Sequence, residues 1–171
     1  MLLKHAVLIG LGIAIGTSFG AALPRAEAQG GQQSVQDFPD LVGGLKGTPG
    51  CIGVRTSSFD NGKQLAIFAW FKNKGAVDAW YNSKMHRDAM KHFFPSMPGQ
   101  AHALEGFKDE KSPLLVVATV TPSDKPGVEG TKLAISQIAI EIYTPVSGGL
   151  AAGGGFGPKE LAVPGLVRFQ P

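Results

Sequence analysis

The stretch Gln64–Lys72, with the sequence QLAIFAWFK, is apolar on both sides of an extended chain. One face of such a strand carries Leu65, Ile67, Ala69 and Phe71, and the other carries Ala66, Phe68 and Trp70. Successive side chains of a strand point to opposite faces, so a strand of this kind needs cover from both sides. The stretch therefore predicts a central strand in a sheet that has other parts of the protein packed on each face.

Apolar spacing predicts the neighbouring elements. A short helix is expected over Asp37–Lys46, where apolar residues recur at helical intervals. Further strands are expected over Cys51–Ser58, Leu114–Thr121 and Ile135–Thr144. The dipeptide Asn61-Gly62 predicts a hairpin turn before the central strand. Hairpins with interspersed helices are typical of an α+β fold whose sheet is mostly antiparallel.

A longer helix is expected over Asn73–Phe94, with Asn73 as its N-cap and Pro95 after its end. Its predicted inward stripe consists of Ala79, Ser83, His86, Met90 and Phe93. Near the C-terminus, the glycine-rich run Ser147–Gly157 predicts an irregular loop.

The first 28 residues have the pattern of a secretory signal peptide. Lys4 and His5 precede the apolar run Ala6–Gly16, and Ala26–Ala28 offers small residues for cleavage before Gln29. The run is shorter than the roughly 20 apolar residues that a membrane span needs. We therefore expect a periplasmic or secreted protein without a stable membrane anchor after cleavage, and a flexible leader over residues 29–36.

Charge and cysteine content exclude some partners and cross-links. The net charge of +3 is too weak and too dispersed to predict nucleic-acid binding. Cys51 is the only cysteine, so an intrachain disulfide is impossible. A lone cysteine of an exported protein is either buried or bridged to a second chain. We expect burial, because the apolar residues Ile52 and Val54 follow.

Several short motifs, in order, carry a resemblance to a known family. They are Pro49–Gly53, the Asn61-Gly62 turn, Ile67–Phe71, Ala79–Ser83 and His86. In this order and spacing they resemble the antibiotic biosynthesis monooxygenase family, which includes quinol monooxygenases and haem-degrading enzymes. The resemblance covers residues 37–122 and leaves residues 123–171 as a C-terminal extension.

The resemblance implies a ferredoxin-like sheet with two helices, paired as a dimeric α+β barrel, and hence a homodimer. Members of the family begin with a strand before the first helix, whereas here a short polar leader stands at that place. We therefore hypothesise that Ile135–Thr144 fills the vacant position of the first strand.

His86 is the candidate catalytic residue, because a histidine facing the space between helix and sheet can move a proton or bind an oxygen atom. Its alternative role is structural, with the ring held by a hydrogen bond near a helix break. Candidate substrate-binding residues are Trp80, Trp70, Phe68, Asn82 and Met90. Aromatic walls suit a flat ligand, but they equally suit core packing.

These residues lead to three hypotheses of function. The first is a cofactor-independent monooxygenase that acts on a small aromatic or quinol-type molecule. The second is a non-catalytic protein that binds haem or another flat hydrophobe. The third is a structural dimer without an active pocket. We expect no metal site, because His86, His92 and His102 lack the spacing of strong metal-ligand motifs.

Overall fold

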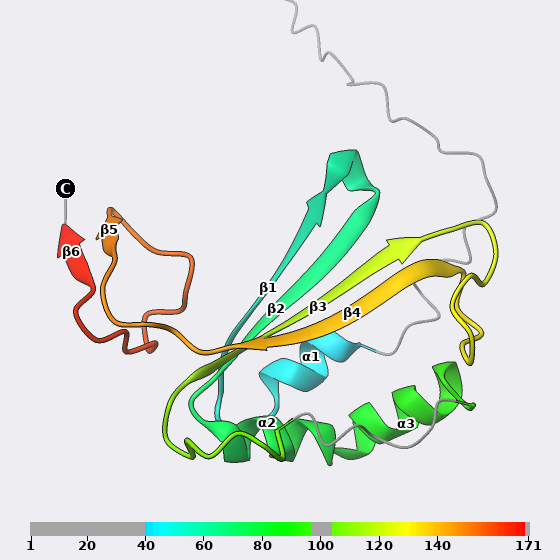
Figure 1. The fold of residues 1–171 in the computed structure, drawn as a ribbon, viewed down its shortest axis with the longest axis horizontal. Coiled ribbons are helices and arrows are strands. Elements are labelled where there is room, and N and C mark those ends of the chain that lie inside the picture. Colours follow the sequence, from blue (N-terminus) through cyan, green and yellow to red (C-terminus); the bar gives the residue numbers. More distant parts are fainter. Residues whose placement is uncertain (1–39, 97–103, 170–171) are drawn as a thin grey trace, which may run out of the picture.

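The structure is a computed structural model that describes residues 40–96 and 104–169. The predicted signal peptide, the predicted leader and His102 lie outside the described residues. The fold is α+β, with a four-stranded antiparallel sheet and helices packed on one face of it (Figure 1). This arrangement is compatible with a ferredoxin-like fold.

The sheet has the strand order β1-β2-β3-β4, and all neighbours are antiparallel. The strands are β1 (Cys51–Phe59), β2 (Gln64–Phe71), β3 (Leu114–Pro122) and β4 (Ile135–Tyr143). All four were expected from the sequence, and each boundary agrees to within one residue. The hairpin turn between β1 and β2, η2 (Asp60–Gly62), has positive φ angles at all three of its residues.

The segment Ile135–Thr144, which was hypothesised to fill the vacant position of the first strand, forms β4. It belongs to the four-stranded sheet and lies at its edge, where it pairs with β3. Strand β3 pairs directly with β2, and β4 does not lie between them. The sheet therefore follows the order of the chain, with the helices α2 and α3 placed in the connection from β2 to β3.

Three helices cover one face of the sheet: α1 (Leu41–Lys46), α2 (Lys74–Tyr81) and α3 (Lys84–Phe93) (Figure 1). The side chain of Asp40 caps α1 by accepting a hydrogen bond of 2.8 Å from the amide of Gly43. Of the predicted helix Asp37–Lys46, only this C-terminal part lies within the described residues.

The predicted helix Asn73–Phe94 is in fact two helices. Asn73 caps the first, α2, as expected, by accepting a hydrogen bond from the amide of Ala76. The chain then leaves the helix at Asn82, and Ser83 caps α3 through a 3.1 Å bond from the amide of His86. The break turns the second helix, so that Ala79 of the predicted stripe is exposed to solvent.

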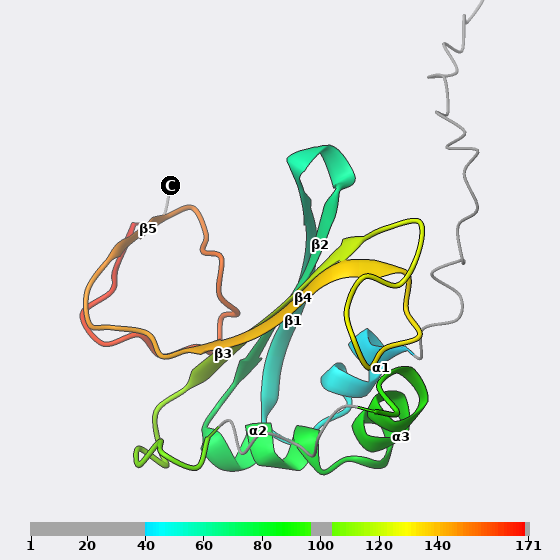
Figure 2. The same cartoon turned by 45° about the vertical axis from the view of Figure 1, so that its right-hand side comes forward.

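The core lies in two clusters under the sheet. The first is formed by buried residues of α1, α2, the strands and the connection before β3: Leu45, Ala69, Phe71, Ala76, Val77, Trp80, Leu104, Leu114 and Val116. The second joins α3 to the β3–β4 connection: Ala89, Phe93, Leu133 and Ile135. Both clusters lie on the side of the sheet that the helices cover. Figure 2 shows the two layers, with the helices on one side of the sheet.

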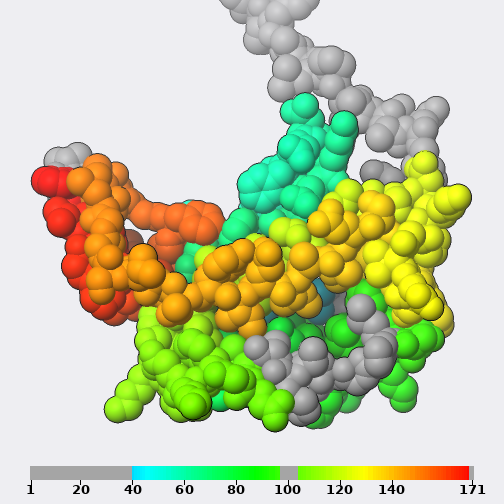
Figure 3. Space-filling model, viewed as in Figure 1, coloured from blue at the N-terminus to red at the C-terminus, as the bar shows by residue number. Residues whose placement is uncertain are grey.

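The opposite side of the sheet, called here the helix-free face, is mixed in character. Strands β2 and β3 contribute the apolar residues Phe68, Trp70, Leu115 and Val117, while β4 contributes Gln137, Ala139, Glu141 and Tyr143, with Glu141 directly opposite Val117. The part of the C-terminal extension that follows β4, residues 144–169, is what the name extension means from here on, and it lies over the β1–β2 end of this face. In Figure 3 the extension, orange to red, projects from one end of the molecule.

The extension contains two short strands that the sequence did not reveal, β5 (Leu150–Ala152) and β6 (Val167–Phe169). They pair in parallel. The run Ser147–Gly157, expected to be an irregular loop, therefore includes a strand. Three residues are too few for an alternating pattern, and the partner strand is distant in the sequence, so no local signal marks this pairing.

Candidate functional site

Trp80 and His86 lie together on the helical side of the sheet. Their rings meet edge to face, with centroids 5.3 Å apart. Trp80 is 7% exposed and His86 is 8% exposed. Helix α1 packs against Trp80. A Cβ atom added to Gly44 of this helix would lie only 3.2 Å from Cζ3 of Trp80.

The His86 side chain is fixed at the junction of α2 and α3. Its Nδ1 atom lies 3.1 Å from the carbonyl oxygen of Tyr81, and its ring stacks edge to face on the Tyr81 ring. Burial lowers the pKa of His86, while the hydrogen bond to the Tyr81 carbonyl opposes this shift. The neutral ring carries its proton on Nδ1, where the carbonyl oxygen accepts it. This is the structural role that the sequence left open for His86.

Trp70 and Phe68 lie on the other side of the sheet. They belong to the helix-free face of β2, while Ala69 and Phe71 between and beside them belong to the core on the helical side. The ring of Phe156, from the C-terminal extension, lies 5.0 Å from both the Phe68 ring and the Trp70 ring. This contact leaves only 3% of Trp70 exposed.

The structure therefore does not bring the predicted aromatic residues into one pocket. Trp80 and His86 are separated from Trp70 and Phe68 by the thickness of the sheet. Asn82 is exposed and donates a hydrogen bond of 2.8 Å to the carbonyl of Asp78 at the end of α2. Met90 is half-buried on α3, one helical turn after His86. Trp70 is separated from the helical side because successive side chains along a strand point to opposite faces, which places it on the opposite face from Phe71.

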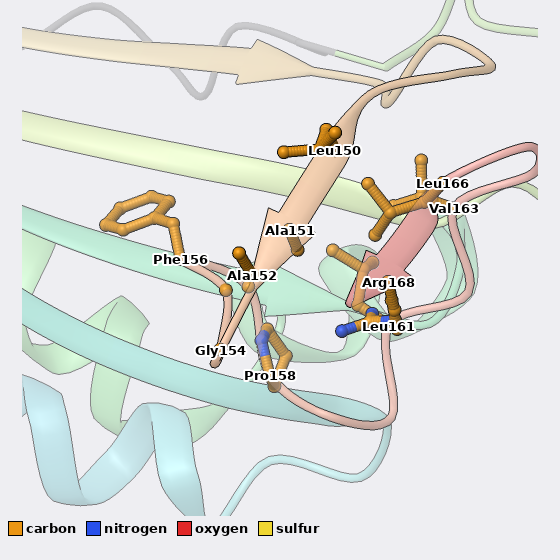
Figure 4. Close-up of a pocket in the computed structure, with 12 residues that line it drawn as sticks. Leu150, Ala151, Ala152, Gly154, Phe156, Pro158, Leu161, Val163, Leu166 and Arg168 are labelled. Carbon is orange, nitrogen blue, oxygen red and sulfur yellow. The ribbon is translucent and has the colours of Figure 1, made fainter. Parts of the chain in front are cut away.

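A hollow that sequence reasoning missed lies in the C-terminal extension, with a volume of about 350 Å³ (Figure 4). The hollow is bounded by β5, β6 and the loop between them. Its lining residues are Leu150, Ala151, Ala152, Gly154, Gly155, Phe156, Gly157, Pro158, Leu161, Val163, Leu166 and Arg168. Leucine, valine and proline recur in this part of the sequence without periodicity, so only the parallel pairing of β5 and β6 brings them together.

The extension is attached to the sheet by close packing at its turn. A Cβ atom on Gly53 of β1 would lie 2.9 Å from Cβ of Pro158, so the proline ring rests directly on the glycine. The guanidinium of Arg55 lies 5.6 Å from the centre of the Phe156 ring. The predicted need for cover on this side of β2 is thus met by the protein's own C-terminal extension over its β1–β2 end.

Cys51 is half-buried at the start of β1, packed against the core, and burial raises the pKa of its thiol. Among the residues that the structure describes, no three histidine, cysteine or acidic side chains are gathered as a metal site requires. Within those same residues, no helix has the length and apolar character needed to cross a membrane.

Comparisons of the chain with family models, with curated proteins and with solved structures gave no match.

Proposed function

We propose that the domain is a non-catalytic assembly unit that pairs with a second copy through its helix-free face. The observation that carries this proposal is the pair of apolar residues Leu115 and Val117 on the β3–β4 half of that face. The helices pack on the other side, and the C-terminal extension lies over the β1–β2 end. A strand face left to water ordinarily carries polar side chains, as β4 does with Gln137 and Glu141, whereas Leu115 and Val117 of β3 are apolar there.

The uncovered half presents side chains suited to a protein partner. Leu115 and Val117 of β3 are half-buried and apolar, and they pair across the strands with Tyr143 and Glu141 of β4. Tyr143 is 49% exposed, and its hydroxyl donates a hydrogen bond of 2.8 Å to Glu141. Interfaces are enriched in tyrosine, which offers a large apolar ring with a polar tip. Face-to-face pairing of two sheets is also what the resemblance to the barrel-forming family implies.

The closed surroundings of Trp80 and His86 favour this proposal over catalysis. A cofactor-independent monooxygenase or a haem-binding protein would need an open pocket beside these two residues. In the described part of the chain, α1 covers Trp80, and the carbonyl oxygen of Tyr81 accepts the hydrogen bond of His86 Nδ1. A neutral, enclosed histidine with a structural partner is poorly placed to exchange protons with a substrate.

Sedimentation velocity at micromolar concentration tests the pairing, with two matched variants. Tyr143→Glu places a charge on the helix-free face, whereas Ile140→Glu places it on the other face of the same strand, at 48% exposure. We expect the unchanged chain and Ile140→Glu to be dimers. We expect the dissociation constant of the Tyr143→Glu dimer to be about 30-fold higher, because the loss of an interface hot spot costs about 2 kcal/mol of binding free energy. A monomeric unchanged chain, or equal behaviour of the variants, would contradict the proposal.

Two assays test the rejected activities. Oxygen uptake with a panel of hydroquinones is expected to stay at the background rate, and titration with haem is expected to give no Soret band of a bound complex. Turnover or haem binding that His86→Ala abolishes would show that the enclosed site opens in solution, and it would overturn the non-catalytic assignment.

A further inference from the structure

The hollow in the C-terminal extension has the dimensions and walls of a ligand site. Its volume of about 350 Å³ falls within the range of about 300–1,000 Å³ that is typical of small-molecule pockets. Apolar residues from β5 and from the loop between the two strands supply most of the wall: Leu150, Phe156, Leu161, Val163 and Leu166. Figure 4 shows these residues together with Arg168, which β6 contributes.

Two arginines converge on the loop that forms one side of this hollow. A Cβ atom on Gly155 would lie 4.0 Å from Nη1 of Arg168, which comes from β6. From the sheet, the Nη2 atom of Arg55 donates a long hydrogen bond of 3.4 Å to the carbonyl oxygen of Gly155. The two cations therefore approach the same glycine, from the hollow and from β1.

Among the described residues, neither guanidinium forms an ion pair, since the ion pairs there are Lys74–Glu110 and Lys84–Asp88. Arg168 lines the hollow, and both arginines are exposed, so an anion from solution can reach them. Two like charges near one another repel. An anion bound to Arg168 reduces this repulsion, and a carboxylate matches the planar fork of an arginine.

We propose that this hollow binds a small apolar organic acid. The hydrocarbon or aromatic part of the ligand lies among Leu161, Val163 and Leu166, and its carboxylate is held by Arg168, while the nearby Arg55 adds to the positive potential. The site is separate from the β3–β4 half of the helix-free face, so it does not depend on the pairing with a second copy.

Calorimetric titration with 2-naphthoate tests the site, and the uncharged 2-naphthalenemethanol serves as a matched ligand. We expect the acid to bind at least about 10-fold more tightly than the alcohol, as a charge-assisted hydrogen bond implies. Inorganic phosphate, which has charge without an apolar body, is expected to bind more weakly than the acid. Equal binding of acid and alcohol, or tighter binding of phosphate, would overturn the proposal.

Matched variants locate the site. Arg168→Gln is expected to weaken binding of the acid at least about 10-fold and to leave the alcohol unchanged. Arg87→Gln, on the exposed surface of α3, is expected to change neither. If Arg168→Gln binds the acid as well as the unchanged chain does, the proposal is wrong. The same titration on Tyr143→Glu separates the two proposals, because binding there is expected whether or not the chain pairs.

Discussion

The Nδ1 atom of His86 lies 3.1 Å from the carbonyl oxygen of Tyr81, five residues earlier in the chain. This contact bridges the break between α2 and α3, because Tyr81 is the last residue of one helix and His86 lies in the first turn of the next. The backbone amide of His86 is meanwhile held by Ser83. One histidine thus fixes the angle between two helices through its ring and its backbone.

This arrangement makes stability depend on pH. Burial lowers the pKa of His86 in the folded protein, whereas the pKa of a histidine in the unfolded chain is about 6.5. Below that pH the unfolded state takes up a proton that folded His86 does not take up until the pH falls further. The free energy of unfolding, measured with urea, is therefore expected to fall as the pH is lowered from 7.5 to 5.5.

Two variants identify the histidine responsible for this dependence. His86→Asn does not titrate and retains a donor for the Tyr81 carbonyl, so its stability is expected to vary less over the same pH range. His92→Asn, at an exposed position of α3, is expected to retain the full dependence. A dependence that persists unchanged in His86→Asn would assign it to another group.

Gly50 is expected to tolerate no side chain. Its φ angle is +83°, and a Cβ atom there would lie 2.6 Å from Cβ of Ala76 in α2. Gly50→Ala combines a left-handed backbone with a clash in the core, and we expect a loss of about 3 kcal/mol. Gly62→Ala is the control, since its φ is +86° and a Cβ atom there has nothing within 4 Å. Its loss is expected to be about 1 kcal/mol. Equal losses in urea unfolding would remove the role assigned to Ala76.

Gly53 sets how closely the C-terminal extension approaches the sheet. Gly53→Ala is expected to displace Pro158, because the added Cβ would lie 2.9 Å from the proline ring. The displacement uncovers Trp70, so we expect a red shift of tryptophan emission and stronger quenching by acrylamide. Gly154→Ala, in the same extension, adds a Cβ atom with nothing within 4 Å and is expected to leave emission unchanged. Identical spectra for both variants would mean that Pro158 does not hold the extension in place.

Cys51 is expected to react slowly while the protein is folded. Burial raises the pKa of its thiol, and a hydrogen bond with the backbone of Gly53 only partly offsets this effect. Because the thiolate is the reactive form, alkylation by iodoacetamide at pH 8 should be several times slower in buffer than in urea. The same rate in both solvents would show that the thiol is accessible in the fold.

The strands could be predicted from the sequence because each carries its own signal. Gln64–Phe71 is apolar on both faces and β4 alternates, so the boundaries and the faces follow from local pattern alone. The turn at Asn61 follows likewise from the backbone that this residue tolerates. The break at Ser83 is harder to see, because serine serves equally in a helix and at its cap. Apolar residues recur at helical spacing both before and after the break, so the periodicity of the sequence does not reveal it.

The candidate site was predicted less well than the fold. A list of aromatic residues does not say on which side of the sheet each lies, and the alternation along β2 separates Trp70 from Trp80. The role of Arg168 could not be anticipated, since it depends on a pairing between strands that are distant in the chain. Long-range contacts of this kind are set by tertiary packing and leave no periodic signal.

The order of strands in the sheet also determines the course of folding. Each strand pairs with its neighbour in the chain, so most contacts of the sheet close short loops, which favours a fast search. The parallel pairing of β5 with β6 involves the last described strand and is made outside the sheet. We therefore expect the sheet to form before the extension docks, and in that interval the whole helix-free face, with Trp70 in it, is open to water.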